Sequence, residues 1–118
     1  MFSVLSTIDL IPTLKSKVHT HVDGYVASAG TFISLMGQRR TMGKHAFLLI
    51  HQLSSGVIGK FSEMEDEMEN CTNIMKLIKA FYKERTKIPM KRLDELLKKD
   101  LNLSAQECLQ YGIVDEII

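Results

Sequence analysis

The sequence has few cysteines, almost no net charge and no apolar run long enough to cross a bilayer. Cys71 and Cys108 lie far apart and form no CxxC pair, which favours a reduced, intracellular chain. A net charge of +1 gives no reason to expect nucleic acid or a membrane surface as the main partner. The apolar first residues lack a basic segment and contain Asp9 and Pro12, which argues against a secretory signal.

The length and the periodicity predict one α/β domain over residues 1–118, with a modest single core. Helices are expected over 1–14, ending near Pro12, and over 31–36, 61–86 and 90–98, with a last one that ends at Gly112. Ser104 and Glu107 match the S-x-x-E capping box that begins this last helix. Strands are expected over 17–22, 46–51 and 113–118, and residues 39–44 are expected to form a basic turn.

The long predicted helix carries an apolar seam with alternating steps of three and four residues. It comprises Phe61, Met64, Met68, Cys71, Met75, Ile78 and Tyr82. Such a methionine-rich seam suits an interface with another chain, and burial against its own domain explains it equally well.

Three residues could carry peptide chemistry. Ser28 stands at a sharp strand-to-helix junction among small residues, where its hydroxyl would be exposed and the N–H of Ala29 could meet an oxyanion. The alternative is that Ser28 only caps the helix. His51 ends a buried run, at the kind of strand end where sites of α/β sheets lie, although a structural histidine is the alternative. Asp100 follows a basic helix end and could equally be a solvated loop carboxylate.

Their spacing in the sequence alone does not show that these three residues form one site. From residue 17 onward, however, the chain resembles the proteolytic subunit of the ATP-dependent Clp protease, the ClpP family. Residues 20–30 (Thr-x-x-x-Gly-x-x-Ala-Ser-Ala-Gly) are similar to its serine signature, and Arg40 with residues 49–52 (Leu-Ile-His-Gln) to its histidine signature. Residues 100–107 (Asp-Leu-Asn-Leu-Ser-Ala-x-Glu) and 111–115 (Tyr-Gly-Ile-Val-Asp) resemble its closing segment.

The resemblance implies a ClpP/crotonase-like spiral of ββα units, with a protruding handle over about residues 54–86 and with N-terminal units missing. It implies a serine endopeptidase in which Ser28 attacks, His51 transfers the proton and Asp100 orients the imidazole, without cofactor or metal. It also implies a homo-oligomer of stacked heptameric rings that acts on polypeptides. The chain has no P-loop, so an AAA+ unfoldase ATPase would be the partner. A cytoplasmic location is expected, and a bacterial, organellar or viral origin stays open.

Several positions depart from the family pattern. Asp23 replaces an apolar residue and, if near the site, would disfavour an oxyanion or shift the pKa of His51. Val26 replaces an alanine and Leu53 a proline, while His19 and His21 could form a metal-binding pair.

Family members also carry strands and a helix before the region that matches residues 1–16, together with a glycine-rich segment that supplies a second oxyanion donor. The sequence is therefore expected to be a fragment, a truncated product or a subunit completed by another chain. A non-catalytic assembly subunit is the main alternative, and an acyl-CoA enzyme of the wider crotonase-like fold is a weaker one.

Overall fold

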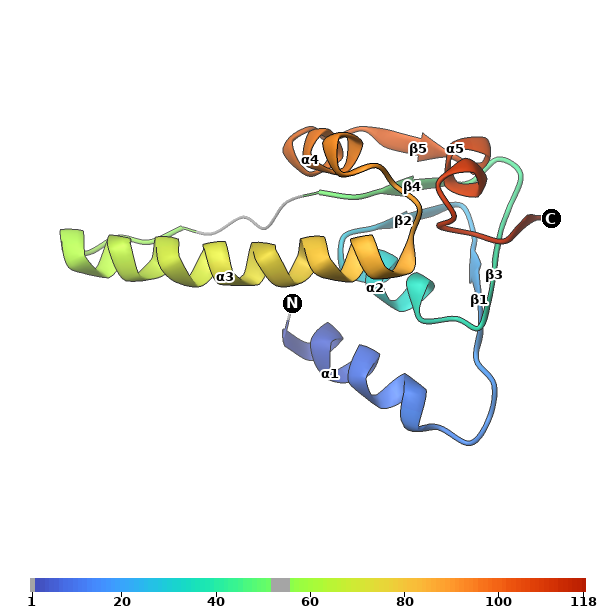
Figure 1. Ribbon diagram of the computed structural model, residues 1–118, viewed down its shortest axis with the longest axis horizontal. Helices are drawn as coiled ribbons and strands as arrows, with labels where there is room; N and C mark the ends of the chain where they lie inside the picture. Colours follow the sequence, from blue (N-terminus) through green and yellow to red (C-terminus); the bar gives the residue numbers. More distant parts are fainter. Residues whose placement is uncertain (1, 52–55) are drawn as a thin grey trace.

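The structure is a computed structural model that describes residues 2–51 and 56–118. Two ββα units follow each other along the chain. The first comprises β1 (His19–Val22), β2 (Tyr25–Ala27) and α2 (Ala29–Leu35). The second comprises β3 (Arg39–Met42), β4 (Phe47–Leu49) and α3 (Phe61–Arg85). Because β1 pairs in parallel with β3 and β2 with β4, the second unit stacks on the first (Figure 1). This confirms the predicted α/β fold built from ββα units.

The remaining elements complete two three-stranded sheets. The chain begins with α1 (Phe2–Leu10), which continues into a 3-10 turn, η1 (Ile11–Thr13), and after α3 it forms α4 (Met90–Lys98), β5 (Asn102–Ser104), α5 (Ala105–Gln110) and β6 (Glu116–Ile117). One sheet has the order β1-β3-β6 and the other β2-β4-β5. Only β5 runs antiparallel to its neighbour β4 among the described strands.

The core draws on both sheets and on all five α-helices of the described chain. In each short strand of the β2-β4-β5 sheet the central side chain points into it, and Leu48 and Leu103 are fully buried there. Helix α4 contributes its apolar face through Leu93, Leu96 and Leu97, a spacing that places all three on one side of the helix.

All five predicted helices are present, but only two of them match their predicted bounds to within one residue: α1 ends at Leu10 before a 3-10 turn, and α2 begins at Ala29, two residues earlier than predicted. Helix α4 matches 90–98, and α3 ends one residue earlier than expected. The predicted capping box is confirmed, because Ser104 Oγ accepts from the N–H of Glu107 at 3.3 Å and the Glu107 carboxylate accepts from the N–H of Ser104 at 3.2 Å. The last helix ends before Gly112, whose φ of 69° favours glycine.

The prediction of a basic turn over residues 39–44 is wrong, since Arg39–Met42 form β3, the central strand of its sheet. The two arginines are tolerated because both are paired. Arg39 forms an ion pair with Glu116 on the neighbouring β6. The guanidinium of Arg40 donates to backbone carbonyls on two other segments, at residues 85, 112 and 113. Strand β5 had no distinct signal in the sequence.

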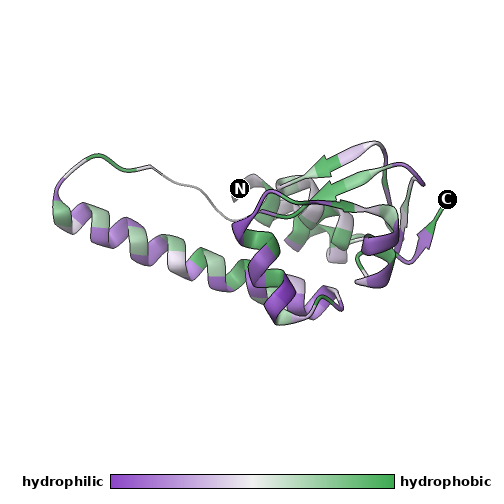
Figure 2. Cartoon of the chain, turned by 90° about the horizontal axis from the view of Figure 1, so that it is seen from above, coloured by the Kyte–Doolittle hydropathy of each residue, from purple (hydrophilic) through white to green (hydrophobic). Residues whose placement is uncertain are grey.

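Helix α3 projects far beyond the rest of the molecule (Figures 1 and 2). Its C-terminal part packs on the domain and buries Ile78 and Tyr82, whereas Phe61 and Met68 at the outer end are 76% and 69% exposed. The apolar seam therefore faces the core over its last turns only. None of the helices in the described ranges is long and apolar enough to cross a membrane.

Candidate active site

Ser28 lies at the junction of β2 and α2 in a conformation that non-glycine residues rarely adopt. Its φ is 55° and its ψ is −118°, and it is the one non-glycine residue with positive φ in the described chain. Hydrogen bonds hold both of its peptide groups. Its N–H donates to the carbonyl of Leu49 at 3.2 Å, and its carbonyl accepts from the N–H of Thr31 at 3.1 Å. This is the sharp strand-to-helix turn that the small residues around Ser28 predict.

The alternative interpretation of Ser28, as a helix cap, is wrong. The residue occupies the N-cap position of α2, but its side chain makes no capping hydrogen bond. A capping serine has an extended backbone that brings Oγ back to the amides of the first turn. Ser104, the cap of α5, has that geometry, with φ of −72° and ψ of 168°. The Ser28 hydroxyl, on a half-buried residue, is therefore available for other chemistry.

The strand register brings the three predicted site positions to one edge of the β2-β4-β5 sheet. Ala27 pairs with Leu49 across β2 and β4, and Leu49 pairs with Asn102 across β4 and β5. Ser28 follows Ala27 directly, and His51 follows Leu49 by two residues. Asp100 precedes Asn102 by two residues, and β5 runs in the opposite direction to β4. All three positions therefore lie just beyond Ala27, Leu49 and Asn102, which are aligned side by side across the sheet.

Continued by two residues, the antiparallel register of β4 and β5 would set position 51 opposite position 100. Directly opposed residues of an antiparallel pair have Cβ atoms about 5 Å apart. A histidine and a carboxylate at such positions suit a hydrogen bond between them. His51 is half-buried and Asp100 is exposed.

Of the positions that depart from the family pattern, Val26 lies in β2 beside the turn at Ser28, whereas Asp23 and the two histidines lie away from this edge. Asp23 precedes β2 at its amino end, so the whole strand, roughly 10 Å long, separates it from Ser28. His21 Nδ1 lies 2.8 Å from the Thr41 hydroxyl. In residues 2–51 and 56–118 no group of three metal-binding side chains gathers. Leu53 falls outside the described residues.

Two residues that the sequence interpretation missed lie directly behind Ser28. The hydroxyl of Thr31 donates to the Ser28 carbonyl at 2.5 Å and lies 2.6 Å from the hydroxyl of Tyr82 on α3. Both residues are buried, and this burial raises the pKa of Tyr82 to about 12. The sequence does place Tyr82 in the apolar seam and Thr31 one helical turn after Ser28. It gives no signal that they meet.

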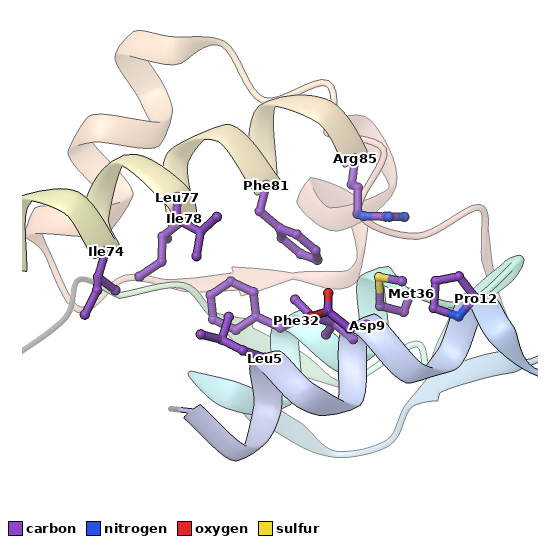
Figure 3. A pocket seen from close by; sticks show the side chains of 11 residues that line it. Leu5, Asp9, Pro12, Phe32, Met36, Ile74, Leu77, Ile78, Phe81 and Arg85 are labelled. Carbon is purple, nitrogen blue, oxygen red and sulfur yellow. The ribbon is translucent and has the colours of Figure 1, made fainter.

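An apolar cavity of about 380 Å³ lies between α1, α2 and the inner part of α3. Figure 3 shows Phe32, Ile74 and Phe81 lining it, with the charged side chains of Asp9 and Arg85 among them. None of the three predicted site residues lines this cavity. It lies on the side of α2 that carries Phe32, and the sheet edge with Ser28 is a separate feature.

Comparison with known proteins identifies the family. The Clp protease family model matches residues 1–118. The chain is 33% identical to the ATP-dependent Clp protease proteolytic subunit of Oltmannsiellopsis viridis, over 96% of this chain and 59% of the relative. It is 34% identical to that of Ostreococcus tauri, over 94% of this chain and 56% of the relative. It is 31% identical to that of Chlorella vulgaris, over 96% and 57%.

The chain thus spans less than three fifths of the length of these relatives. The match nevertheless includes nearly all of its own residues, in agreement with the stacked ββα units and the sharp turn at Ser28. The chain belongs to the Clp protease family, as a relative of its ClpP proteolytic subunits.

Proposed function

We propose that this chain is a serine-type endopeptidase subunit of the Clp type, with Ser28 as nucleophile, His51 as general base and Asp100 as the residue that orients His51. The observation that carries the proposal is the common edge of the β2-β4-β5 sheet beyond which all three positions lie. The backbone of Ser28 adds support, because it presents the hydroxyl without a capping hydrogen bond.

In the proposed reaction Ser28 Oγ attacks the carbonyl carbon of the scissile peptide, and its proton passes to the imidazole of His51. The N–H of Ala29 donates to the developing oxyanion. When the tetrahedral intermediate collapses, the C–N bond breaks and His51 returns the proton to the leaving amine. A water molecule then hydrolyses the acyl-enzyme by the same route. Neither a cofactor nor a metal takes part in these steps.

The proposal extends to partners and location. The exposed outer side chains of α3, among them Phe61 and Met68, would pack in a homo-oligomer of stacked heptameric rings. The substrates would be unfolded polypeptides, delivered by an AAA+ unfoldase ATPase in the cytoplasm. The relatives are named ATP-dependent protease subunits. The chain covers only part of their length, so the activity of the whole protein belongs to the proposal as well.

A non-catalytic or truncated assembly subunit is the second candidate. The exposed apolar side chains on the outer part of α3 support it, because they would serve assembly without any chemistry at Ser28. Such a subunit would keep α3 and its exposed apolar side chains but would not form an acyl-enzyme.

A fluorophosphonate probe separates the two candidates, because it reacts covalently only with an activated serine. We would label the chain alone, and also mixed with the Chlorella vulgaris proteolytic subunit whose own nucleophile has been replaced. Labelling of the 13.4 kDa chain that disappears in Ser28→Ala, but persists in the exposed-serine control Ser16→Ala, supports the peptidase.

His51→Ala should abolish the labelling, and Asp100→Asn should slow it strongly, because the imidazole would lose the carboxylate that orients it. If the chain stays unlabelled in both preparations while assembling normally with the relative, the peptidase proposal fails. The non-catalytic candidate then stands.

A further inference from the structure

A chain of two hydrogen bonds holds the peptide group that joins Ser28 to Ala29. The hydroxyl of Thr31 donates to the Ser28 carbonyl oxygen, and the hydroxyl of Tyr82 lies 2.6 Å from that of Thr31. We infer that Thr31 and Tyr82 are positioning residues, which orient and polarise this peptide group so that the Ala29 N–H serves as oxyanion donor. The inference rests on the proposed peptidase function and adds two residues to its site.

The direction of the two hydrogen bonds follows from the count of protons. A threonine hydroxyl carries one proton, and the Ser28 carbonyl can only accept. Because Thr31 gives its proton to that carbonyl, it must accept in the second bond, and the Tyr82 hydroxyl must donate. Both residues are almost fully buried, at 1% and 2% exposure, so water cannot readily replace either partner. A tyrosine hydroxyl keeps its proton at neutral pH, and burial extends this to higher pH by raising the pKa of Tyr82 to about 12.

The Ser28 carbonyl and the Ala29 N–H are the two ends of one planar peptide group. Holding the oxygen therefore also sets the direction in which the N–H points. Successive hydrogen bonds polarise one another, so a donor chain ending on the carbonyl makes the N–H at the other end a stronger donor. The peptide group before Ser28 is fixed independently, through its bond to Leu49 on β4.

The position of the Tyr82 hydroxyl is set by the packing of α3 against α2. The ring of Tyr82 lies 5.4 Å from that of Phe32 and 6.1 Å from that of Phe81, and these two rings lie 5.2 Å apart. Figure 3 shows Phe32 and Phe81 extending toward each other from the two helices. Three tilted aromatic rings leave Tyr82 little freedom, and its hydroxyl is directed at Thr31.

The first test measures how fast the fluorophosphonate probe reacts with Ser28. In this reaction Ser28 Oγ bonds to phosphorus, fluoride leaves, and the phosphonyl oxygen takes the place of the oxyanion. Tyr82→Phe removes one hydroxyl, and we expect it to lower the maximal labelling rate about two- to tenfold with unchanged probe affinity. Thr31→Val should lower the rate at least as much, whereas Thr31→Ser keeps the hydroxyl and should restore it.

Matched controls remove hydroxyls of the same kind elsewhere. Tyr111→Phe deletes a hydroxyl that accepts from Arg92, and Thr72→Val deletes one that bonds to the carbonyl of Met68 on the outer part of α3. Both should label at the wild-type rate. If Tyr82→Phe and Thr31→Val also label at that rate, while Ser28→Ala does not label, the positioning inference is refuted and the peptidase proposal survives.

A second measurement tests the inference without any labelling. In the NMR spectrum of the chain, the amide proton of Ala29 should shift upfield in Tyr82→Phe and Thr31→Val, because its peptide group loses polarisation, and should stay in place in Thr31→Ser and Tyr111→Phe. An unchanged Ala29 resonance in both test variants overturns the inference. If the wild type instead stays unlabelled both alone and in the assembly, the peptidase proposal fails, and the oxyanion role of the Ala29 N–H fails with it, whatever the Ala29 resonance shows.

Discussion

The backbone of Ser28 makes a quantitative prediction about stability, in which the variants Ser28→Gly and Ser28→Ala are compared. At φ of 55° and ψ of −118° a side chain with a Cβ is strained, and such residues cost about 1–3 kcal/mol. Alanine keeps the Cβ and hence the strain, whereas glycine removes it. Glycine also loses about 0.5–1 kcal/mol through the greater freedom of the unfolded chain. The net expectation is that Ser28→Gly is more stable than Ser28→Ala by about 1 kcal/mol.

Urea unfolding, followed by far-UV circular dichroism, measures this difference. The two variants should have equal slopes and different midpoints, and their melting temperatures should differ by roughly 4 °C for a chain of this size. The matched control is Ala80→Gly, at an exposed position inside α3, where glycine should cost about 1 kcal/mol. If Ser28→Gly is less stable than Ser28→Ala, as Ala80→Gly is less stable than the wild type, the strain at Ser28 is refuted. Neither variant at position 28 should retain labelling by the fluorophosphonate probe.

Three further predictions concern stability. Burial raises the pKa of Cys108 from 9.0 and that of Tyr82 from 10.0, each to about 12. Because these two groups ionise at lower pH in the unfolded chain than in the folded one, their contribution to the free energy of unfolding is constant below pH 9 and falls as the pH rises toward 12, by at most about 1.4 kcal/mol per pH unit and group. In urea titrations, Cys108→Ala should remove the loss of stability between pH 9 and 10. An unchanged dependence of stability on pH in that variant would contradict this. Ser104→Ala should cost about 1 kcal/mol through the lost cap, whereas Ser104→Asp should be nearly neutral, and equal stability of both would argue against capping. Arg40→Lys should cost about 1–3 kcal/mol in thermal unfolding. The Arg40 guanidinium donates from Nη1 to the carbonyls of residues 85, 112 and 113 and from Nε to that of Gly37, and a lysine ammonium cannot donate from two positions along its side chain. Arg39→Lys, in an exposed ion pair, should cost less than about 1 kcal/mol, and the reverse order would count against this role of Arg40.

The sequence predicts the elements whose signal is local. The helix over residues 90–98 has its apolar side chains on one face and follows a proline, and the structure confirms it to the residue. The cap at Ser104 is equally local, since it needs only a serine and a glutamate three residues later. The α/β class follows from the alternation of these elements and is also confirmed.

Strand β3 could not be predicted from local pattern, because what makes it a strand lies elsewhere in the chain. Its two arginines resemble a solvated turn until Glu116 and the carbonyls of residues 85, 112 and 113 are in place around them. Strand β5 is hidden for the same reason, since three residues with one buried leucine become a strand only beside β4. These pairings join positions at least 45 residues apart, which no local window contains.

The site divides in the same way. The family resemblance selects Ser28, His51 and Asp100, and the register supplies a common sheet edge for them that spacing could not. The backbone angles of Ser28 also test the competing interpretation of this residue as a helix cap, since a capping serine would have an extended backbone. Thr31 and Tyr82 are beyond sequence reasoning, because their contact joins α2 to a helix that begins thirty residues later.

Helix α3 shows why a periodic pattern predicts an element more securely than its environment. The steps of three and four residues define a helix and a continuous apolar seam, and both are present. Only Ile78 and Tyr82 of that seam are fully buried, because α2 and the core lie beside the last turns. Burial of a large apolar side chain contributes about 1.5–3 kcal/mol, so the outer residues Phe61 and Met68 leave several kcal/mol of stabilisation unused in the single chain. Packing against the domain thus stabilises the inner turns of α3. The outer turns gain comparable stabilisation only if a further surface packs against them.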